Sequence, residues 1–394
     1  MSAADRVGSE RLGTASAAAA VGDRARRIAV NVALYTLAFA TALALSALLV
    51  VVATDASPGT VFSAMYEGSL KTGAARGLTL DEATPVLIVG LGAVIASRAG
   101  IINIGPEGQL LIGATTATAV ALHAEGPAWL VIGLTLVAGA AGGALWAGIA
   151  ALLRFTRGVD VVISTLLLNF IAAEVVSYAV GRPWLLQETT SNLQKLPQSD
   201  RIPEELQLPR LGSFPGFNVS SAVFIAAALV VVVAFMMARS RWGFRLKMLG
   251  YNPTAARKAG VSVALMGGGA LLLSGAFAGL SGGVMLTGTV FRLQPGFSQG
   301  IGFNGLLAAL IARRNPIAVV PVAFFFGALR AGGGFLASTG VPRFLVDIVQ
   351  ALLVLAALFP PLFLDLARRR RELRNARAAA RRTAPVPETV GAAA

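Results

Sequence analysis

Apolar residues occur in long runs along this chain, separated by short polar segments or by segments rich in glycine and proline. We distinguish ten runs, at 28–53, 83–97, 103–123, 128–152, 159–181, 219–239, 261–289, 297–312, 316–337 and 344–364. About 20 helical residues, at 1.5 Å each, cover a bilayer core of about 30 Å. The pattern predicts an all-α polytopic membrane protein with about ten transmembrane helices over 28–364, and tails at 1–27 and 365–394.

The first run, 28–53, follows three arginines, as the hydrophobic region of a signal peptide would. It is longer than the roughly 7–15 residues of such a region. We therefore expect a retained first helix, with cleavage as the alternative.

Composition excludes several kinds of chemistry. Charged residues make up 13% of the chain, against about 25% in soluble proteins. The chain has no cysteine and one histidine, His123, so thiolate metal sites and cysteine nucleophiles are excluded. It has no GxxxxGK[ST] motif, so it cannot hold ATP in a P-loop. We therefore expect no enzyme activity, no metal and no cofactor in this chain.

The net charge of +14 follows the membrane. If all ten runs cross, 24 of the 33 lysines and arginines lie on the side of the N-terminus and 8 on the other side, with Arg330 inside a span. The positive-inside rule then places both termini in the cytoplasm, in a multi-pass membrane protein. The proline-rich segment 182–218 becomes an extracytoplasmic loop, an ordered cap or docking site. The arginine-rich tail is expected to contact membrane lipid, in preference to nucleic acid.

One apolar region is interrupted near 100–109, where glycines and a proline cannot support an undisturbed helix. Three polar residues, Asn103, Glu107 and Gln109, lie on this break. An ionisable residue within a membrane is costly unless it faces a cavity or a partner, so Glu107 is a candidate functional residue. The alternative is that Glu107 is an N-terminal cap that complements a helix dipole.

A second interruption lies near 292–305 and carries Asn304. The runs that follow the two breaks are five spans apart and would cross in opposite directions. Interrupted helices at matching positions of two inverted halves indicate a transport site, so we expect an inverted five-plus-five repeat. The run 300–312 is too short to span alone, which suits a re-entrant segment, whereas Arg313 and Arg314 favour a crossing.

Further charged or amide residues inside predicted spans are Asp160, Asn169, Glu174, Arg330, Asp347 and Gln350. Arg330 and Asp347 fall in neighbouring spans and suit a structural ion pair, with a functional role as the alternative. Glu174 lies deep in its span, where an ionisable residue is a functional candidate.

The longest internal cytoplasmic segment, 239–260, suits a docking role. Asn252 followed by Pro253 predicts a capped short helix, and Gly260 is expected to end it. A short amphipathic helix in such a loop is what a transport subunit needs to contact a separate motor. The alternative is a basic loop that only satisfies the positive-inside rule.

Several segments together resemble the nucleoside-type permeases of ABC transporters, within the wider family that imports branched-chain amino acids, ribose and other simple sugars. They are AGIINIGPEGQLLIGA at 99–114, GFRLKMLGYNPTAA at 243–256, GFNG at 302–305, RRNP at 313–316 and FGALRAGG at 326–333. The chain departs from the family pattern at Arg313 and Arg314, where a Leu-Gly ending is usual, and at Tyr251, where an acid is usual.

The resemblance implies the permease subunit, in the bacterial plasma (inner) membrane, of an ATP-driven importer of nucleosides or related sugar-bearing solutes that works by alternating access. Its implied partners are a cytoplasmic ABC ATPase that binds ATP and Mg, a second permease subunit and an extracytoplasmic substrate-binding lipoprotein. Asn103, Glu107, Gln109 and Asn304 would line the substrate path. Coupling to the ATPase would involve Gly250, Tyr251, Asn252, Ala255, Ala256 and Arg257. The alternative is an ion-coupled secondary transporter of small polar solutes, with Glu107 or Glu174 carrying the ion.

Overall fold

The computed structural model describes residues 58–189, 196–213 and 215–338, with shorter stretches between 30 and 53 and between 345 and 370. The chain forms two units, one of residues 1–55 with 347–394 and one of residues 56–346. The second unit contains both helix breaks, the predicted outer loop and the predicted docking segment. The predicted tails lie outside the described residues, apart from Arg370, and Asp347 lies outside them too.

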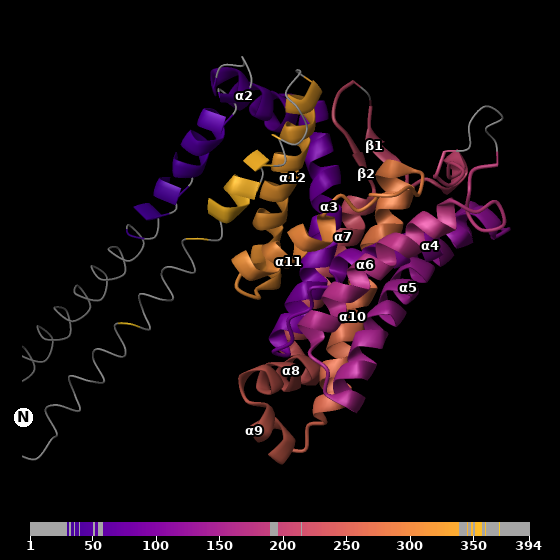
Figure 1. Ribbon diagram of the computed structural model, residues 1–394, viewed down its shortest axis with the longest axis vertical. Coiled ribbons are helices and arrows are strands. Elements are labelled where there is room, and N and C mark those ends of the chain that lie inside the picture. The colour runs from indigo at the N-terminus through magenta and orange to yellow at the C-terminus, as the bar shows by residue number, and fades with distance from the viewer. Residues whose placement is uncertain are drawn as a thin grey trace, which may run out of the picture. The chain divides into compact units, whose positions relative to one another are not determined.

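The second unit is a bundle of helices with one small hairpin (Figure 1). Its helices are α2 (Pro58–Tyr66), α3 (Gly73–Arg98), α4 (Pro106–His123), α5 (Ala128–Arg157), α6 (Val161–Val180), α7 (Ala222–Arg239), α8 (Arg241–Tyr251), α9 (Pro253–Lys258), α10 (Val263–Met285), α11 (Ile301–Ile311) and α12 (Pro316–Ser338). π-Helical segments η1 (Glu67–Lys71) and η3 (Leu286–Val290) follow α2 and α10, and η2 (Glu204–Leu206) is a 3₁₀ turn.

Six described helices are long and apolar enough to cross a membrane: α3, α5, α6, α7, α10 together with η3, and α12. This confirms the predicted all-α polytopic class. The ten spans and the inverted repeat remain predictions, because the first and last runs lie largely outside the described residues. Helix α11 has only 11 residues, as expected for an interrupted segment.

Helix α3 begins at Gly73, ten residues before the predicted span at 83–97. The prediction was wrong at this end because Asp81 and Glu82 have the character of a loop. Both carboxylates have partners across the bundle, so the helix carries them without leaving isolated charges.

Glycines allow α4, α5 and α10 to pack closely. A Cβ at Gly279 would lie 2.1 Å from the carbonyl oxygen of Gly139, and one at Gly143 would lie 2.2 Å from that of Gly275. Small residues at such contacts let helix backbones approach each other in membranes. The stretch 279–283 also matches the GxSxG pattern of hydrolases, but Ser281 is buried inside α10 and donates to the Pro85 carbonyl at 3.0 Å.

The predicted outer loop, 182–218, is tied to the bundle. Its last part belongs to an antiparallel hairpin of β1 (Arg210–Gly212) and β2 (Asn218–Ser220), in which Leu211 pairs with Val219. The sequence had indicated no strand here, because three-residue strands are too short to display alternation. Nearer its start, Glu188 accepts hydrogen bonds from Gln198 at 2.8 Å and Arg292 at 2.7 Å. These bonds lower the pKa of the Glu188 carboxyl, the one from Gln198 most.

Candidate functional site

The two helix breaks predicted from the sequence meet each other through Glu107. This residue lies in the first turn of α4, and its carboxylate accepts from the Ser298 hydroxyl at 2.5 Å and from the backbone N–H groups of Gly300 at 3.1 Å and Gly302 at 2.8 Å. The acceptor therefore caps the N-terminus of α11, where unpaired N–H groups and the helix dipole favour a negative charge. A Cβ at Gly302 would lie 2.3 Å from the Glu107 nitrogen, so the two helix starts are in direct contact.

Asn103 and Gln109 form a buried polar network beside this contact. Each is 1% exposed, and the Asn103 amide donates to the Gln109 side-chain oxygen at 2.9 Å and to the Ser274 hydroxyl at 3.1 Å. The Asn103 oxygen accepts from the Gly105 N–H at 2.9 Å and the Gln109 amide at 3.2 Å. Buried polar groups require such partners, because an unsatisfied one costs about 1–3 kcal/mol.

Helix α6 supports the same break. Asn169 accepts from the Gly108 N–H at 2.8 Å and donates to the Ile104 carbonyl at 2.9 Å. Thr165 accepts from the Ile104 N–H at 3.3 Å. The irregular backbone of the first break is thus satisfied by side chains. The sequence had singled out Asn169 as a polar residue in a span without indicating this partner.

The four predicted path residues are only partly brought together. Asn103 and Gln109 bond each other, and Glu107 bonds the second break. Asn304 is half-buried on α11, and its side chain bonds none of these residues. Glu174 is exposed on α6.

A cavity of about 730 Å³ lies at the hairpin end of the bundle, and we call it the polar cavity. It lies between η1, the start of α3, the hairpin, η3 and the last turns of α12. None of the four predicted path residues lines it. Its charged lining residues among those described are Glu67, Lys71, Asp81, Glu82, Arg210 and Arg330.

Each acid of the polar cavity has a basic partner. Arg330 Nε donates to Glu82 Oε2 at 2.7 Å, and its other nitrogens donate to the backbone and side-chain oxygens of Gln299 at 3.1 and 3.2 Å. Arg210 lies 3.5 Å from Asp81, and Lys71 bonds Glu67. The sequence had placed Arg330 beside Asp347. It gave no sign of Glu82, because that residue is 248 positions away and was assigned to a loop.

At the opposite end of the unit, α8 and α9 occupy the predicted docking segment (Figure 1). The capped short helix is confirmed: Asn252 Oδ1 accepts from the N–H groups of Thr254 and Ala255, both at 3.0 Å, at the start of α9. Helix α8 was not predicted, because the sequence up to Tyr251 was taken as loop. Gly260 follows α9 with φ +78°.

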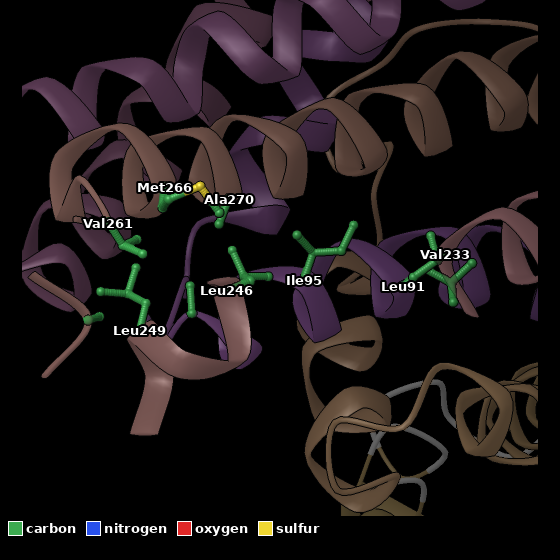
Figure 2. Packing of buried hydrophobic residues seen from close by; sticks show 10 residues of the cluster. Leu91, Ile95, Val233, Leu246, Leu249, Val261, Met266 and Ala270 are labelled. Atoms are coloured by element: carbon green, nitrogen blue, oxygen red, sulfur yellow. The ribbon is translucent and has the colours of Figure 1, made fainter. Parts of the chain in front are cut away.

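The two short helices are fixed to the bundle by a buried apolar cluster (Figure 2). Leu246 and Leu249 of α8 and Ala256 of α9 are buried with Leu91 and Ile95 of α3. Further members of the cluster are Val233, Val261, Met266 and Ala270. A force on α8 would therefore act on α3 and α10 directly.

The predicted coupling residues differ in burial. Tyr251 is 81% exposed, and Asn252, Ala255 and Arg257 are also exposed, whereas Ala256 is buried. Gly250 packs on the end of α3, where a Cβ would lie 2.1 Å from the Arg98 carbonyl oxygen. The exposed members are available to a partner, and Gly250 and Ala256 attach the segment.

Comparison with known proteins gives consistent matches. Residues 77–358 match the family described as branched-chain amino acid transport system / permease component. The chain is 36% identical over 313 residues to a glucose ABC transporter permease protein of Haloferax volcanii, covering 77% of this chain and 81% of the relative. It is 33% identical over 297 residues to a guanosine ABC transporter permease protein of Bacillus subtilis (75% and 84%). A nucleoside ABC transporter permease protein of Lactococcus lactis is 27% identical over 295 residues (74% and 80%).

Proposed function

The chain belongs to the branched-chain amino acid transport system / permease component family, and we propose that it imports nucleosides or related sugar-bearing solutes as the membrane subunit of an ATP-driven transporter. The relatives named above are permeases for glucose, guanosine and nucleosides, all neutral, hydroxyl-rich solutes. The sequence has no P-loop motif, so the energy comes from an ion gradient or from a partner. The similarity to permeases of ABC transporters favours a partner ATPase.

The polar cavity is the observation that carries the choice of solute. Its three acids and three bases cancel, so the lining gives no net attraction for a cation or an anion. Its volume of about 730 Å³ falls within the range of about 300–1,000 Å³ for small-molecule sites. Fixed donors and acceptors such as Arg330, Gln299 and Asn218 suit a neutral solute with several hydroxyl groups.

The helix breaks supply the deeper part of the route. Ile301 lines the polar cavity and begins α11, whose N-terminus Glu107 holds. In this proposal, Glu107, Asn103, Gln109 and Asn304 become accessible when the contact between the two breaks opens during alternating access. The hydrogen bonds that Glu107 accepts from Ser298, Gly300 and Gly302 then stabilise the closed state of the path.

The two ends of the unit suit different partners. The α8–α9 end contacts a cytoplasmic ABC ATPase, which binds ATP and Mg, through Tyr251, Asn252, Ala255 and Arg257. The hairpin end and the 182–218 loop face a substrate-binding lipoprotein outside the cell. A second permease subunit completes the path, and both termini are cytoplasmic.

Reconstitution tests the proposal against an ion-coupled transporter. The full chain is placed in proteoliposomes with its ATPase, second permease and binding protein, and uptake of radiolabelled guanosine and glucose is measured. We expect uptake that requires ATP on the ATPase side and persists when protonophore and ionophore remove the gradients. Uptake driven by a proton or sodium gradient in vesicles lacking the ATPase would refute it.

A further inference from the structure

A second cavity, at the α8–α9 end, is positively charged, whereas the charges that line the polar cavity balance one another. It has a volume of about 520 Å³ and is lined by Arg98, Lys247, Gly250, Tyr251, Arg313 and Arg314; we call it the basic pocket. Four of its six lining residues are cationic and, within the described part of the chain, none is acidic.

The helix ends around the pocket reduce the electrostatic repulsion between its cations. Helices α3, α8 and α11 end at Arg98, Tyr251 and Ile311, so three C-terminal dipole ends meet near the pocket. Each carries about half a negative charge, which stabilises nearby cations. Arg98, Lys247 and Arg314 alone carry three full positive charges, which exceed these partial charges, so the pocket remains positive.

The arginines are also held in place. Arg98 Nε donates to the Arg314 carbonyl at 2.8 Å, and an Arg314 guanidinium nitrogen donates to the Ser97 carbonyl at 3.3 Å. These bonds leave further guanidinium N–H groups available, and a positioned guanidinium binds a carboxylate with good geometry.

The backbone at this pocket is strained. Arg313 and Arg314 have φ values of +51° and +61°, a left-handed conformation that glycine adopts without penalty and that costs other residues about 1–2 kcal/mol each. Non-glycine residues in such conformations cluster at functional sites. The strain at Arg314, which lines the basic pocket, therefore points to a functional role for this arginine.

We propose that the basic pocket receives an acidic side chain of the ATPase partner, and that this charge pairing helps select which ATPase the permease accepts. The inference rests on the proposed function, because it assumes that the α8–α9 end docks the motor. Tyr251, with the Lys247 ammonium 5.9 Å from its ring centre, forms an exposed aromatic rim of the kind enriched at protein interfaces. That rim favours a protein partner over a lipid phosphate. Charge complementarity of this sort also repels wrong partners.

Lysine chemistry gives a direct test. The chain has four lysines, Lys71, Lys195, Lys247 and Lys258, and only Lys247 lines the basic pocket. A carbodiimide joins a lysine amine to a carboxylate that touches it. In the purified complex with its ATPase, we expect mass spectrometry to find Lys247 joined to an Asp or Glu of the ATPase. The Lys247→Arg variant should lose this product and keep any product at Lys258. An intact complex with no Lys247 product would overturn the proposal.

A second test removes charge without adding strain. The double variant Arg313→Gly/Arg314→Gly removes two charges and relieves the backbone strain at both positions, because glycine suits positive φ. Its folding is checked by thermal denaturation, because the bond from Arg314 to the Ser97 carbonyl is lost. We expect it to bind the ATPase about tenfold more weakly, as charged hydrogen bonds are lost, and to show weaker salt dependence. Arg241→Gln, which removes an exposed charge of α8 outside the pocket, is the matched control and should change affinity little.

Varying the lipid composition tests the alternative occupant of the pocket, a lipid phosphate. The affinity measurement is made in nanodiscs of phosphatidylcholine alone and with phosphatidylglycerol. If the double variant loses affinity for the ATPase equally in both kinds of nanodisc, the result supports an acidic residue of the ATPase. If it loses affinity only with phosphatidylglycerol, the pocket is assigned to lipid and the proposal is overturned. If the wild-type chain binds no ATPase at all, the proposed function itself fails. Normal affinity in the double variant refutes only the pocket.

Discussion

The polar cavity and the basic pocket lie at opposite ends of one helical unit and differ in their balance of charge. Around the polar cavity, Glu82 pairs with Arg330 and Asp81 with Arg210, so its charges are satisfied within the chain. Around the basic pocket, four cations have no acidic neighbour among the described lining residues. A balanced site suits a neutral solute, whereas an unbalanced one suits a charged partner. The difference therefore assigns solute recognition and partner recognition to separate ends.

The largest expected effect comes from removing one positive charge from the charge-balanced lining of the polar cavity. Arg330→Ala leaves Glu82 and Gln299 without their donor, and the Arg330 side chain is only 11% exposed. We expect uptake to fall at least tenfold and the free energy of unfolding to fall by about 2–3 kcal/mol, below the range for a fully buried pair because Glu82 is 32% exposed. Uptake assays and thermal denaturation measure these changes.

Arg76→Ala is the control, because Arg76 is exposed on α3 and does not line the cavity. It should change either quantity little. Equal effects of the two variants would show that the balance of charge in the cavity has no special role.

At the other end, Gly250→Ala should separate α8 from α3. The added Cβ would lie 2.1 Å from the Arg98 carbonyl, so the backbone must shift, at a cost of about 1–3 kcal/mol. We expect ATP hydrolysis to lose its coupling to uptake while the protein still inserts into the membrane. Gly269→Ala, where a Cβ meets nothing within 4 Å, is the control and should remain coupled. Normal coupling in Gly250→Ala would contradict the role of this contact.

Glu107→Gln tests the contact between the two breaks, midway between the ends. The variant keeps one acceptor oxygen but loses the charge that caps α11, which should cost about 1 kcal/mol. We expect uptake to be impaired more than assembly, as measured by transport and by size-exclusion chromatography. Assembly failing first would mean that Glu107 acts only as a cap. Ser298→Ala, which removes one of the three donors, should have a smaller effect.

The smallest expected effect concerns the predicted outer loop. Because hydrogen bonds from Gln198 and Arg292 lower the pKa of Glu188, this carboxylate stabilises the loop above its ordinary pKa, and the contribution is lost as the pH falls through the lowered value. Hydrogen exchange of the loop, compared with Glu188→Gln at each pH, should show protection at neutral pH that disappears in acid. Equal exchange in both proteins at neutral pH would contradict this role.

How far the sequence could predict these features depended on the range of the interactions. Apolar runs predicted the helices, and the local signals at Asn252 and Pro253 predicted the capped α9, because both depend on neighbouring residues. The breaks at Glu107 and near Asn304 were predicted for the same reason, but not their contact, which joins residues about 190 positions apart. The Glu82–Arg330 pair was missed because a charge just outside an apolar run has the character of a loop until its partner is known, whereas α3 continues through Glu82.

Whether one end recognises the solute and the other the motor is tested most directly by measuring ATP hydrolysis and guanosine uptake in the same proteoliposomes. The wild type is compared with Arg330→Ala and Gly250→Ala in the complete complex. We expect Arg330→Ala to lose uptake while the ATPase remains bound at wild-type affinity, and Gly250→Ala to hydrolyse ATP without uptake or to lose the ATPase. Parallel loss of uptake, hydrolysis and ATPase affinity in both variants would contradict this division of roles.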